Sequence, residues 1–304
     1  MAVQPTQLWL PALDRFERAH PLRRLLSRAD RLADDKRRRL EGLAGAFRIE
    51  ATTLPAAALI REHLAGDAGD DGWLNADPAW VQPDMTGVRL LACGPMQLSM
   101  DEAQAYAEVL QPAFAEAGLQ LEIAAPDHWQ LRLASGTALP AFAAPEQALG
   151  EDLYQHLPQG AEGRPWRVLL NEVQVLLHQH PLNAARQSRG LPPVNSVWLW
   201  GAGRLPTSLQ SGLAGVVGND TLLLALASRA GIPCRPGSQE AVATAAAGWL
   251  VDLQDLTSTE FDEAWCSAVQ TLARRQPVYI AFASGERWSW RPRHRWRVWR
   301  GAAR

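Results

Sequence analysis

Residues 178–203, HQHPLNAARQSRGLPPVNSVWLWGAG, combine two histidines, two asparagines, two arginines and a Gly-x-Gly. His178 and His180 are two positions apart, so on a helix they point in different directions, which disfavours a shared metal ion. Asn183 and Arg186 are three apart and share one helical face, where amide and guanidinium groups could bind an anion. The stretch is therefore either an anion-binding site or a junction between a helix and a buried strand.

Two glycines, Gly201 and Gly203, follow the apolar strand expected at 196–200. Open α/β sheets bind ligands at the carboxyl ends of their strands, and glycines there can expose N–H groups to a phosphate. Such glycines also serve tight turns, and no third glycine stands at the dinucleotide spacing. We predict both glycines and Asn195 as ligand contacts. In the alternative interpretation the asparagines only cap and turn the junction, and the arginine is solvated.

The hydrophobic patterning along the 304 residues predicts the elements that must position this stretch. Buried strands are expected at 6–10, 196–200, 248–253 and 277–283. One helix is expected over 21–40, with KRRR (36–39) as its solvated end. Alternating strands and helices favour an α/β fold, with a mostly parallel sheet flanked by helices.

A second pattern, strand, helix, strand, strand, lies at 88–133 and indicates a small inserted α+β domain. Its helix is expected at 100–117 with a Ser-x-x-Glu capping box, and its last two strands are close enough for a hairpin. The Gly/Asp-rich segment 65–72 suggests a boundary before it. We therefore expect a discontinuous α/β core (1–72 and 150–304) around an inserted domain (73–149).

Composition disfavours a membrane-spanning, secreted or zinc-binding protein. No apolar run reaches the length of a membrane span, and the N-terminus has no basic segment ahead of a short apolar run, which disfavours a signal peptide. Three cysteines far apart, without a CxxC pair, disfavour a disulfide framework or a zinc site. We expect a cytoplasmic protein with no cofactor.

The C-terminal segment 286–304 alternates tryptophan with arginine and contains no acid after Glu286. Four of its arginines share one parity and would line one face of an extended chain: Arg291, Arg293, Arg295 and Arg297. This face could bind nucleic acid or acidic lipid, because arginine neutralises phosphates and because arginine and tryptophan side chains can both stack on bases. The structural alternative is a hairpin of 278–282 with 287–291, whose tryptophans cover the core while the arginines stay in water.

NEVQVLLHQHPLNAARQSRGLPPVNSVWLWGAG (171–203) resembles the segment of archaeal-type cofactor-independent phosphoglycerate mutases that reads HPVN-x-x-R-x-x-x-G-x-x-P-A-N, followed by a strand and a Gly-x-Gly. It looks closer still to the mutase-like RpfE-type regulatory proteins of plant-pathogenic and related proteobacteria. The resemblance covers nearly the whole chain in order. It implies an alkaline-phosphatase-like core, here degenerate, and a pocket in which arginines grip a phosphorylated three-carbon acid. Arg132 and Arg186 are the matching candidates.

The mutase resemblance also implies two divalent metals, Asp and His ligands at strand ends, and a serine that carries the phosphoryl group. TQLWLPALD lacks the family's Asp-Gly pair after the first strand. WLVDLQDL (249–256) has no histidine, only Asp252 and Asp255, and Trp265-Cys266 replace the Gly-His of a second signature. We therefore assign no metal ligand and no catalytic residue.

These patterns favour a non-catalytic regulatory or ligand-sensing protein that binds a small phosphorylated or carboxylate ligand. Two alternatives stay open. One is a nucleic-acid-associated protein that acts through the C-terminal tail, and the other is a residual phosphoglycerate mutase. A protein partner is not identified.

Overall fold

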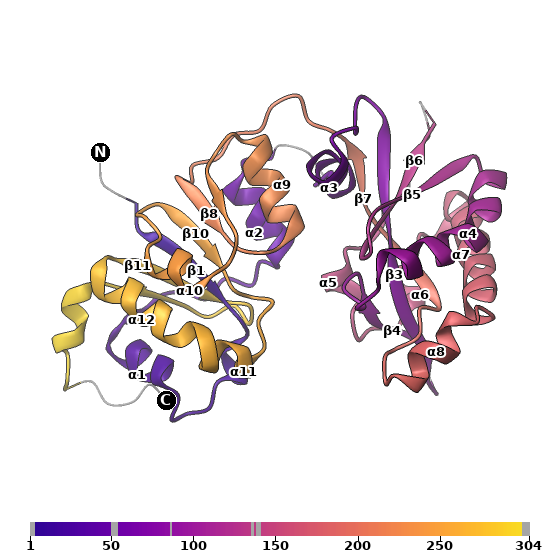
Figure 1. Cartoon of the computed structure of the whole chain (residues 1–304). Coiled ribbons are helices and arrows are strands. Elements are labelled where there is room, and N and C mark those ends of the chain that lie inside the picture. The colour runs from indigo at the N-terminus through magenta and orange to yellow at the C-terminus, as the bar shows by residue number, and fades with distance from the viewer. Residues whose placement is uncertain (1–3, 50–53, 86, 135–136, 138–140, 300–304) are drawn as a thin grey trace. The chain divides into compact units, whose positions relative to one another are not determined.

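The computed structural model describes residues 4–49, 54–85, 87–134, 137 and 141–299. The chain forms two compact units (Figure 1). Residues 1–49 with 208–304 are called the terminal unit, and residues 50–207 the central unit. Both are mixed α/β structures in which helices flank a sheet. Within the described ranges, no helix is both long and apolar enough to cross a membrane.

The terminal unit contains a seven-stranded sheet in the order β2-β12-β11-β1-β10-β8-β9. Its strands are β1 (Thr6–Leu10), β2 (Asp30–Arg31), β8 (Gly215–Val217), β9 (Cys234–Arg235), β10 (Trp249–Asp252), β11 (Val278–Phe282) and β12 (Arg287–Trp290). Its helices are η1 (Leu13–Arg15), α1 (Pro21–Arg28), α2 (Arg39–Ala46), α9 (Thr221–Arg229), α10 (Gln239–Ala243), α11 (Ser258–Glu260), the π-helical η2 (Phe261–Trp265), α12 (Cys266–Arg275) and η3 (Pro292–Trp296). The strands from β11 to β9 are parallel, as the sequence predicts, and β12 and β2 add an antiparallel edge.

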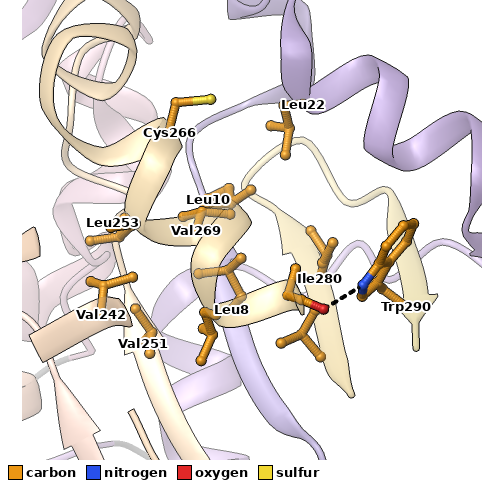
Figure 2. Close-up of a cluster of buried hydrophobic side chains, with 14 of the residues drawn as sticks. Leu8, Leu10, Leu22, Val242, Val251, Leu253, Cys266, Val269, Ile280 and Trp290 are labelled. Atoms are coloured by element: carbon orange, nitrogen blue, oxygen red, sulfur yellow. Dashed lines mark hydrogen bonds between the residues drawn. The ribbon is translucent and has the colours of Figure 1, made fainter. Parts of the chain in front are cut away.

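Side chains of β1 alternate between the two faces of this sheet, so helices cover both. Leu8 and Leu10 are fully buried in a cluster with residues of α1, α10 and α12, including Leu22, Val242 and Val269 (Figure 2). Trp9 points to the other face, where its ring lies against Gly42 of α2. Parallel strands covered on both faces explain why their sequences are almost continuously apolar.

The central unit contains an antiparallel sheet built around its longest strand, β3. Its strands are β3 (Gly72–Pro83), β4 (Val88–Cys93), β5 (Leu119–Ala125), β6 (His128–Leu133) and β7 (Ser196–Arg204). Its helices are α3 (Ala56–Ala65), α4 (Met100–Glu116), α5 (Pro145–Ala148), α6 (Leu153–His156), α7 (Gly160–His178) and α8 (Leu182–Ser188). Strands β6 and β4 pair in succession with one edge of β3, and β7 pairs with the other. The predicted helix α4, its Ser99–Glu102 capping box and the β5–β6 hairpin are confirmed.

Strand β7 does not join the parallel sheet as the sequence suggested. It pairs antiparallel with β3, from Gly72↔Arg204 to Ala79↔Ser196. The unit boundaries consequently differ from the expected core (1–72 and 150–304) and insert (73–149). The expected break at 65–72 is instead a turn between α3 and β3 inside the central unit. Sequence patterning missed β3 because its glycine, asparagine, aspartate and proline residues are depleted in strands.

The helix expected over 21–40 is wrong in its second half. It ends at Arg28, and Asp30–Arg31 instead form β2 on the edge of β12. Leu32, the residue after β2, also donates its backbone N–H to Arg287 O of β12. A helical continuation would lose these long-range backbone hydrogen bonds, and local apolar spacing carries no information about them.

Candidate functional site

Asn183, a predicted ligand contact, is buried at the junction of α8 and β7 and is hydrogen-bonded on every side. Its Oδ1 accepts from Tyr106 Oη at 2.7 Å and from Val194 N at 2.8 Å. Its Nδ2 donates to Leu177 O and Val194 O at 2.8 and 2.9 Å. Burial raises the pKa of Tyr106 to about 12, so its hydroxyl remains a donor. The neighbouring His180 accepts from Leu182 N through Nδ1, in keeping with a capping role.

Arg186 is not solvated: its side chain is completely buried. Its Nη2 donates to Met96 O at 2.6 Å and its Nε to Pro192 O at 3.0 Å. Its Nη1 lies 3.5 Å from Glu102 Oε2, at the first turn of α4. The guanidinium therefore ties α8 to the loop before α4 and to the loop before β7. The solvated alternative for this arginine is wrong.

Asn195 binds the backbone of β3 at a β-bulge. Its Oδ1 accepts from Val81 N and its Nδ2 donates to Val81 O, both at 2.8 Å. The β3–β4 register shifts between Trp80 and Val81, so the amide side chain supplies hydrogen bonds beside the bulge. Asn183 and Asn195 thus hold the helix-to-strand junction, as the structural alternative proposed.

The Gly201 and Gly203 positions are needed for close packing of α3 on β7. Gly201 has φ +68°, and a Cβ there would lie 2.8 Å from Ala56 Cβ and 3.2 Å from Asn75 Nδ2. A Cβ on Gly203 would lie 2.5 Å from Pro55 Cβ. Both contacts are too short for any side chain, so helix packing accounts for this Gly-x-Gly.

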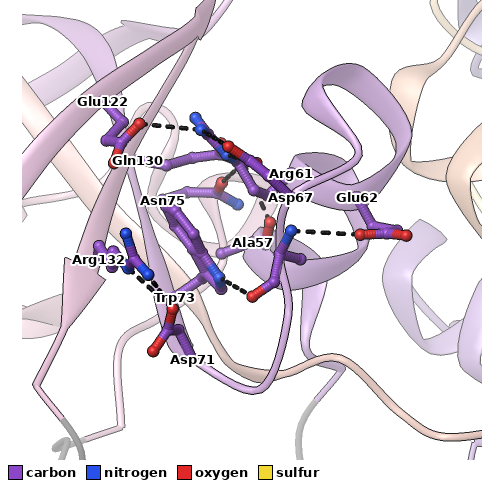
Figure 3. A network of polar contacts seen from close by, with 11 residues as sticks. Ala57, Arg61, Glu62, Asp67, Asp71, Trp73, Asn75, Glu122, Gln130 and Arg132 are labelled. Atoms are coloured by element: carbon purple, nitrogen blue, oxygen red, sulfur yellow. Dashed lines mark hydrogen bonds and ion pairs between the residues drawn. The ribbon is translucent and has the colours of Figure 1, made fainter.

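Arg132 lies on β6, in the polar network between the sheet and α3 (Figure 3). Its Nη2 and Nε bind Asp71 Oδ2 at 2.5 and 2.8 Å, and its guanidinium lies 6.0 Å from the Trp73 ring centroid. The buried Arg61 stacks over the same ring at 4.8 Å and also binds Glu122 at 2.9 Å. The side chain of Arg132 is half-exposed, whereas Asn183, Arg186 and Asn195 are buried or partly buried at the helix-to-strand junction. Arg132 and Arg186 belong to the same unit, but Arg132 binds Asp71 whereas Arg186 binds Met96, Pro192 and Glu102, so the described contacts do not bring the two predicted ligand contacts together.

The C-terminal arginines do not line one face. The hairpin of β11 and β12 is confirmed, with Trp288 and Trp290 buried against the core. Beyond it the chain forms a 3-10 helix, with about three residues per turn, so alternate side chains diverge. Arg291, Arg293 and Arg295 are exposed, and Arg297 forms an ion pair with Asp30 at 2.5 Å. The single basic face expected for an extended chain is therefore wrong.

A second charged cluster lies at the carboxyl ends of the parallel strands β8 and β10, where α/β proteins commonly bind ligands. Arg39, the first residue of α2, directs Nη2 to Asp252 Oδ2 at 2.6 Å and Nη1 to Asp220 Oδ2 at 2.9 Å. Asp255 is 3.5 Å away and mostly exposed. Asp252 ends β10, while Asp220 caps α9 by accepting from Leu223 N. We call Arg39, Asp220, Asp252 and Asp255 the strand-end cluster.

Electrostatics favour a charged guanidinium in this cluster. Burial by itself lowers the pKa of Arg39, but Asp252, Asp220 and Asp255 outweigh that effect and the pKa is raised. Burial raises the pKa of Asp252, and Arg39 opposes this rise. Among the described residues, no group of three or more His, Cys, Asp or Glu side chains has an arrangement that would hold a metal ion. The carboxylates instead surround a cation of the chain itself.

Sequence reasoning missed this cluster, although part of its signal was visible. Asp252 and Asp255 were noted at a strand end, but Arg39 was assigned to a solvated helix end. Asp220 follows the short strand Gly215–Val217, which was not predicted. Acids after two buried apolar segments were the available signal. The distance of 213 positions between Arg39 and Asp252 hid their pairing.

A third group, also missed, surrounds a buried carboxylate on β3. Asp77 Oδ2 accepts from Trp200 Nε1 at 2.6 Å, and Asp77 Oδ1 lies 3.8 Å from His128 Nδ1. Burial raises the pKa of Asp77, although His128 and Trp200 oppose the rise. Burial also raises the pKa of the nearby Cys93 thiol well above its usual value. The thiol therefore stays protonated, which is the opposite of an activated nucleophile.

Comparison with known proteins gives partial similarity to cofactor-independent phosphoglycerate mutases. No protein-family model matches the chain. The 2,3-bisphosphoglycerate-independent phosphoglycerate mutase of Methanothrix thermoacetophila is 36% identical over 63 residues, 21% of this chain and 16% of that protein. The mutase of Methanosarcina mazei is 37% identical over 62 residues, 20% of this chain and 16% of that protein. The match therefore spans about a sixth of these relatives' length.

Among solved structures, the PH0037 protein from Pyrococcus horikoshii matches with a TM-score of 0.50 and 11% identity, over 96% of this chain and 88% of that chain. The cofactor-independent phosphoglycerate mutase from Thermoplasma acidophilum matches with a TM-score of 0.40 and 12% identity, over 95% and 89%. The likeness to PH0037 concerns the fold alone. The chain is thus a mixed α/β protein with a short segment similar to the mutases.

Proposed function

We propose that this protein is a non-catalytic regulatory protein with a phosphoglycerate-mutase-like fold. The observation that carries the proposal is the strand-end cluster. The mutase resemblance implies divalent metals held by Asp and His side chains at strand ends, where this chain has an arginine inside three carboxylates. A guanidinium supplies positive charge there but no Lewis acid for phosphoryl transfer.

The resemblance of 171–203 to the mutase-like RpfE-type regulatory proteins favours the same proposal. Fewer of the predicted ligand contacts are available for a ligand-sensing role than the sequence suggested. The polar groups of Asn183, Arg186 and Asn195 already bind other parts of the central unit. Arg132, half-exposed and paired with Asp71, is the predicted ligand contact best able to exchange its partner for an anion.

Thermal unfolding with manganese, then with 3-phosphoglycerate, tests the proposal, together with a mutase assay containing manganese. A ligand that binds only the folded state stabilises it, by about 2.7 kcal/mol when the ligand is present at one hundred times its dissociation constant. This stabilisation raises the midpoint temperature of unfolding. We expect no turnover and no manganese-dependent shift. Turnover would establish the residual mutase instead, and a shift with manganese would reveal a metal site and favour that alternative.

Arg132→Ala separates the ligand-sensing part of the proposal from the non-catalytic part. A shift with 3-phosphoglycerate alone, lost in Arg132→Ala, would support a surviving pocket. Arg204→Ala is the matched control, because Arg204 is also exposed in the central unit and donates to Asp70 O. A shift that survives Arg132→Ala, or is lost equally in the control, would remove Arg132 from the ligand site.

A further inference from the structure

The last described residues of the terminal unit expose large apolar side chains beside exposed basic ones. Trp296, Val298 and Trp299 are 67%, 71% and 76% exposed. Exposed large apolar side chains gathered at one place often mark an interaction site. With the exposed Arg291, Arg293 and Arg295, these residues form what we call the Arg/Trp surface.

This surface stands on a well-packed base. His294 is 1% exposed, and its ring meets the buried Trp290 ring edge-on at 5.7 Å. Arg297 forms an ion pair with Asp30, and Arg28 Nη1 donates to Arg295 O at 2.9 Å. Helix η3 thereby contacts both α1 and α12. Trp296, the last residue of η3, is therefore presented on an ordered turn, and Trp299 follows three residues later.

The charge around the surface is strongly positive. Its three arginines are exposed, no acid follows Glu286 in the sequence, and the nearby Asp30 carboxylate is already paired with Arg297. Arg24 on α1 and Arg274 on α12 are also exposed on the two helices that η3 contacts. Charge complementarity therefore requires an anionic partner.

We propose that the Arg/Trp surface docks the protein on an anionic phospholipid bilayer. Tryptophan favours the boundary between headgroups and acyl chains, and an adjacent exposed valine adds apolar area that lipid can bury. Arginines attract acidic headgroups, with about a fivefold gain in binding per residue near the surface. A fluid anionic surface satisfies arginines that diverge around a 3-10 turn, because it imposes no fixed spacing on them.

Single-stranded nucleic acid fits this geometry less well. It needs a row of basic groups along one backbone and free aromatic faces for the bases. Here the arginines diverge, and the Arg295 guanidinium already covers the Trp296 ring at 4.9 Å from its centroid. Val298 offers no stacking face. The nucleic-acid interpretation of this segment therefore becomes an outcome of the test.

Co-sedimentation of the full chain with vesicles tests the proposal. Binding to phosphatidylcholine vesicles containing phosphatidylglycerol is expected, with at least tenfold weaker binding to phosphatidylcholine alone. Trp296→Ala with Trp299→Ala should weaken binding at least tenfold, and Arg293→Glu with Arg295→Glu should do so by a similar factor. Raising the salt concentration should weaken it further, because exposed charges are screened.

Matched controls remove equally exposed residues elsewhere. Val168→Ala with Val175→Ala, and separately Arg164→Glu, change exposed positions of α7 and should leave vesicle binding unchanged. Unchanged thermal midpoints show that every variant is folded. The proposal fails if anionic vesicles are not bound or if the tryptophan variant binds them as well as the original chain. Binding of a single-stranded oligonucleotide without vesicle binding would assign the surface to nucleic acid.

Discussion

Two arginines, the completely buried Arg186 in the central unit and the partly buried Arg39 in the terminal unit, have opposite kinds of partner. Arg186 donates mainly to backbone carbonyls, with a single carboxylate 3.5 Å away. Arg39 is surrounded by three carboxylates at the ends of parallel strands. The first holds loops together, and the second neutralises acidic groups where α/β folds usually bind ligands.

The difference teaches that the chemistry of an arginine follows from its partners rather than from its local motif. Arg186 lies in the segment that resembles the mutase motif, yet its hydrogen bonds are all used within the fold. Arg39 lies in a run of basic residues typical of a solvated helix end, yet it occupies the strand-end cluster. Substitutions at both positions test this difference between the two arginines.

Replacing Arg186 should give the largest effect. Arg186→Met removes the donor to Met96 O and Pro192 O and one of the two arginines beside the Glu102 carboxylate, which should cost about 3–4 kcal/mol of unfolding free energy. Urea denaturation measures the loss. Arg189→Met is the control, because Arg189 is exposed and pairs with the same Glu102, and it should cost less than about 1 kcal/mol. Similar costs for the two variants would refute the structural role of Arg186.

Replacing Arg39 should cost about 2–3 kcal/mol at neutral pH, because Asp252 would remain buried and unpaired. Arg39 opposes the burial-driven rise of the pKa of Asp252, so its loss raises that pKa further. A raised carboxylate pKa costs stability at high pH, and the cost disappears as pH falls through that pKa toward the ordinary 3.8.

Denaturation of Arg39→Met at several pH values should therefore show a deficit that shrinks on acidification. The double variant Arg39→Met with Asp252→Asn should recover part of the loss, because it removes the unpaired charge. Arg38→Met changes the exposed neighbour and should have little effect. A deficit independent of pH and of Asp252 would mean that packing, not charge, makes Arg39 important.

Asn183→Ala tests whether neutral groups secure the same junction as Arg186. It removes four hydrogen bonds that include two buried carbonyl acceptors, and should cost about 2 kcal/mol. Tyr106→Phe removes only one of these bonds and should cost about 1 kcal/mol. Both follow from urea denaturation. An unchanged midpoint for Asn183→Ala would leave this side chain available for a ligand.

Asp77 is a buried carboxylate without an arginine, so it sharpens the comparison with Asp252. Its raised pKa means that the folded state favours the neutral form, and stability falls as pH rises above the ordinary 3.8 through the raised value. Asp77→Asn should stabilise the protein at neutral pH by about 1 kcal/mol, a few degrees in the thermal midpoint. The gain should vanish in acid. Destabilisation at neutral pH would show that the Asp77 charge is needed by His128.

The sequence by itself determined elements whose physics is local. The capping box at Ser99, the hairpin of 119–133 and the C-terminal hairpin formed as predicted. Of the apolar strands expected in the parallel sheet, those at 6–10, 248–253 and 277–283 joined it and the one at 196–200 did not. Continuous apolar runs, caps and short connections identify such elements because the sequence signal for each lies within a few residues. The resemblance to the mutases agrees with the partial similarity found over 63 residues of this chain.

Tertiary structure alone decided which long-range partners each segment found. Strand β3 contains residues that are depleted in strands, yet it is stabilised by pairing on both edges. One of these partners is β7, which the sequence placed in the parallel sheet. The burial of Arg186 and the ion pair between Arg39 and Asp252 each depend on segments that are far apart in sequence. No local pattern encodes these pairings, because their free energy comes from desolvated charges and hydrogen bonds that exist only once the chain has folded.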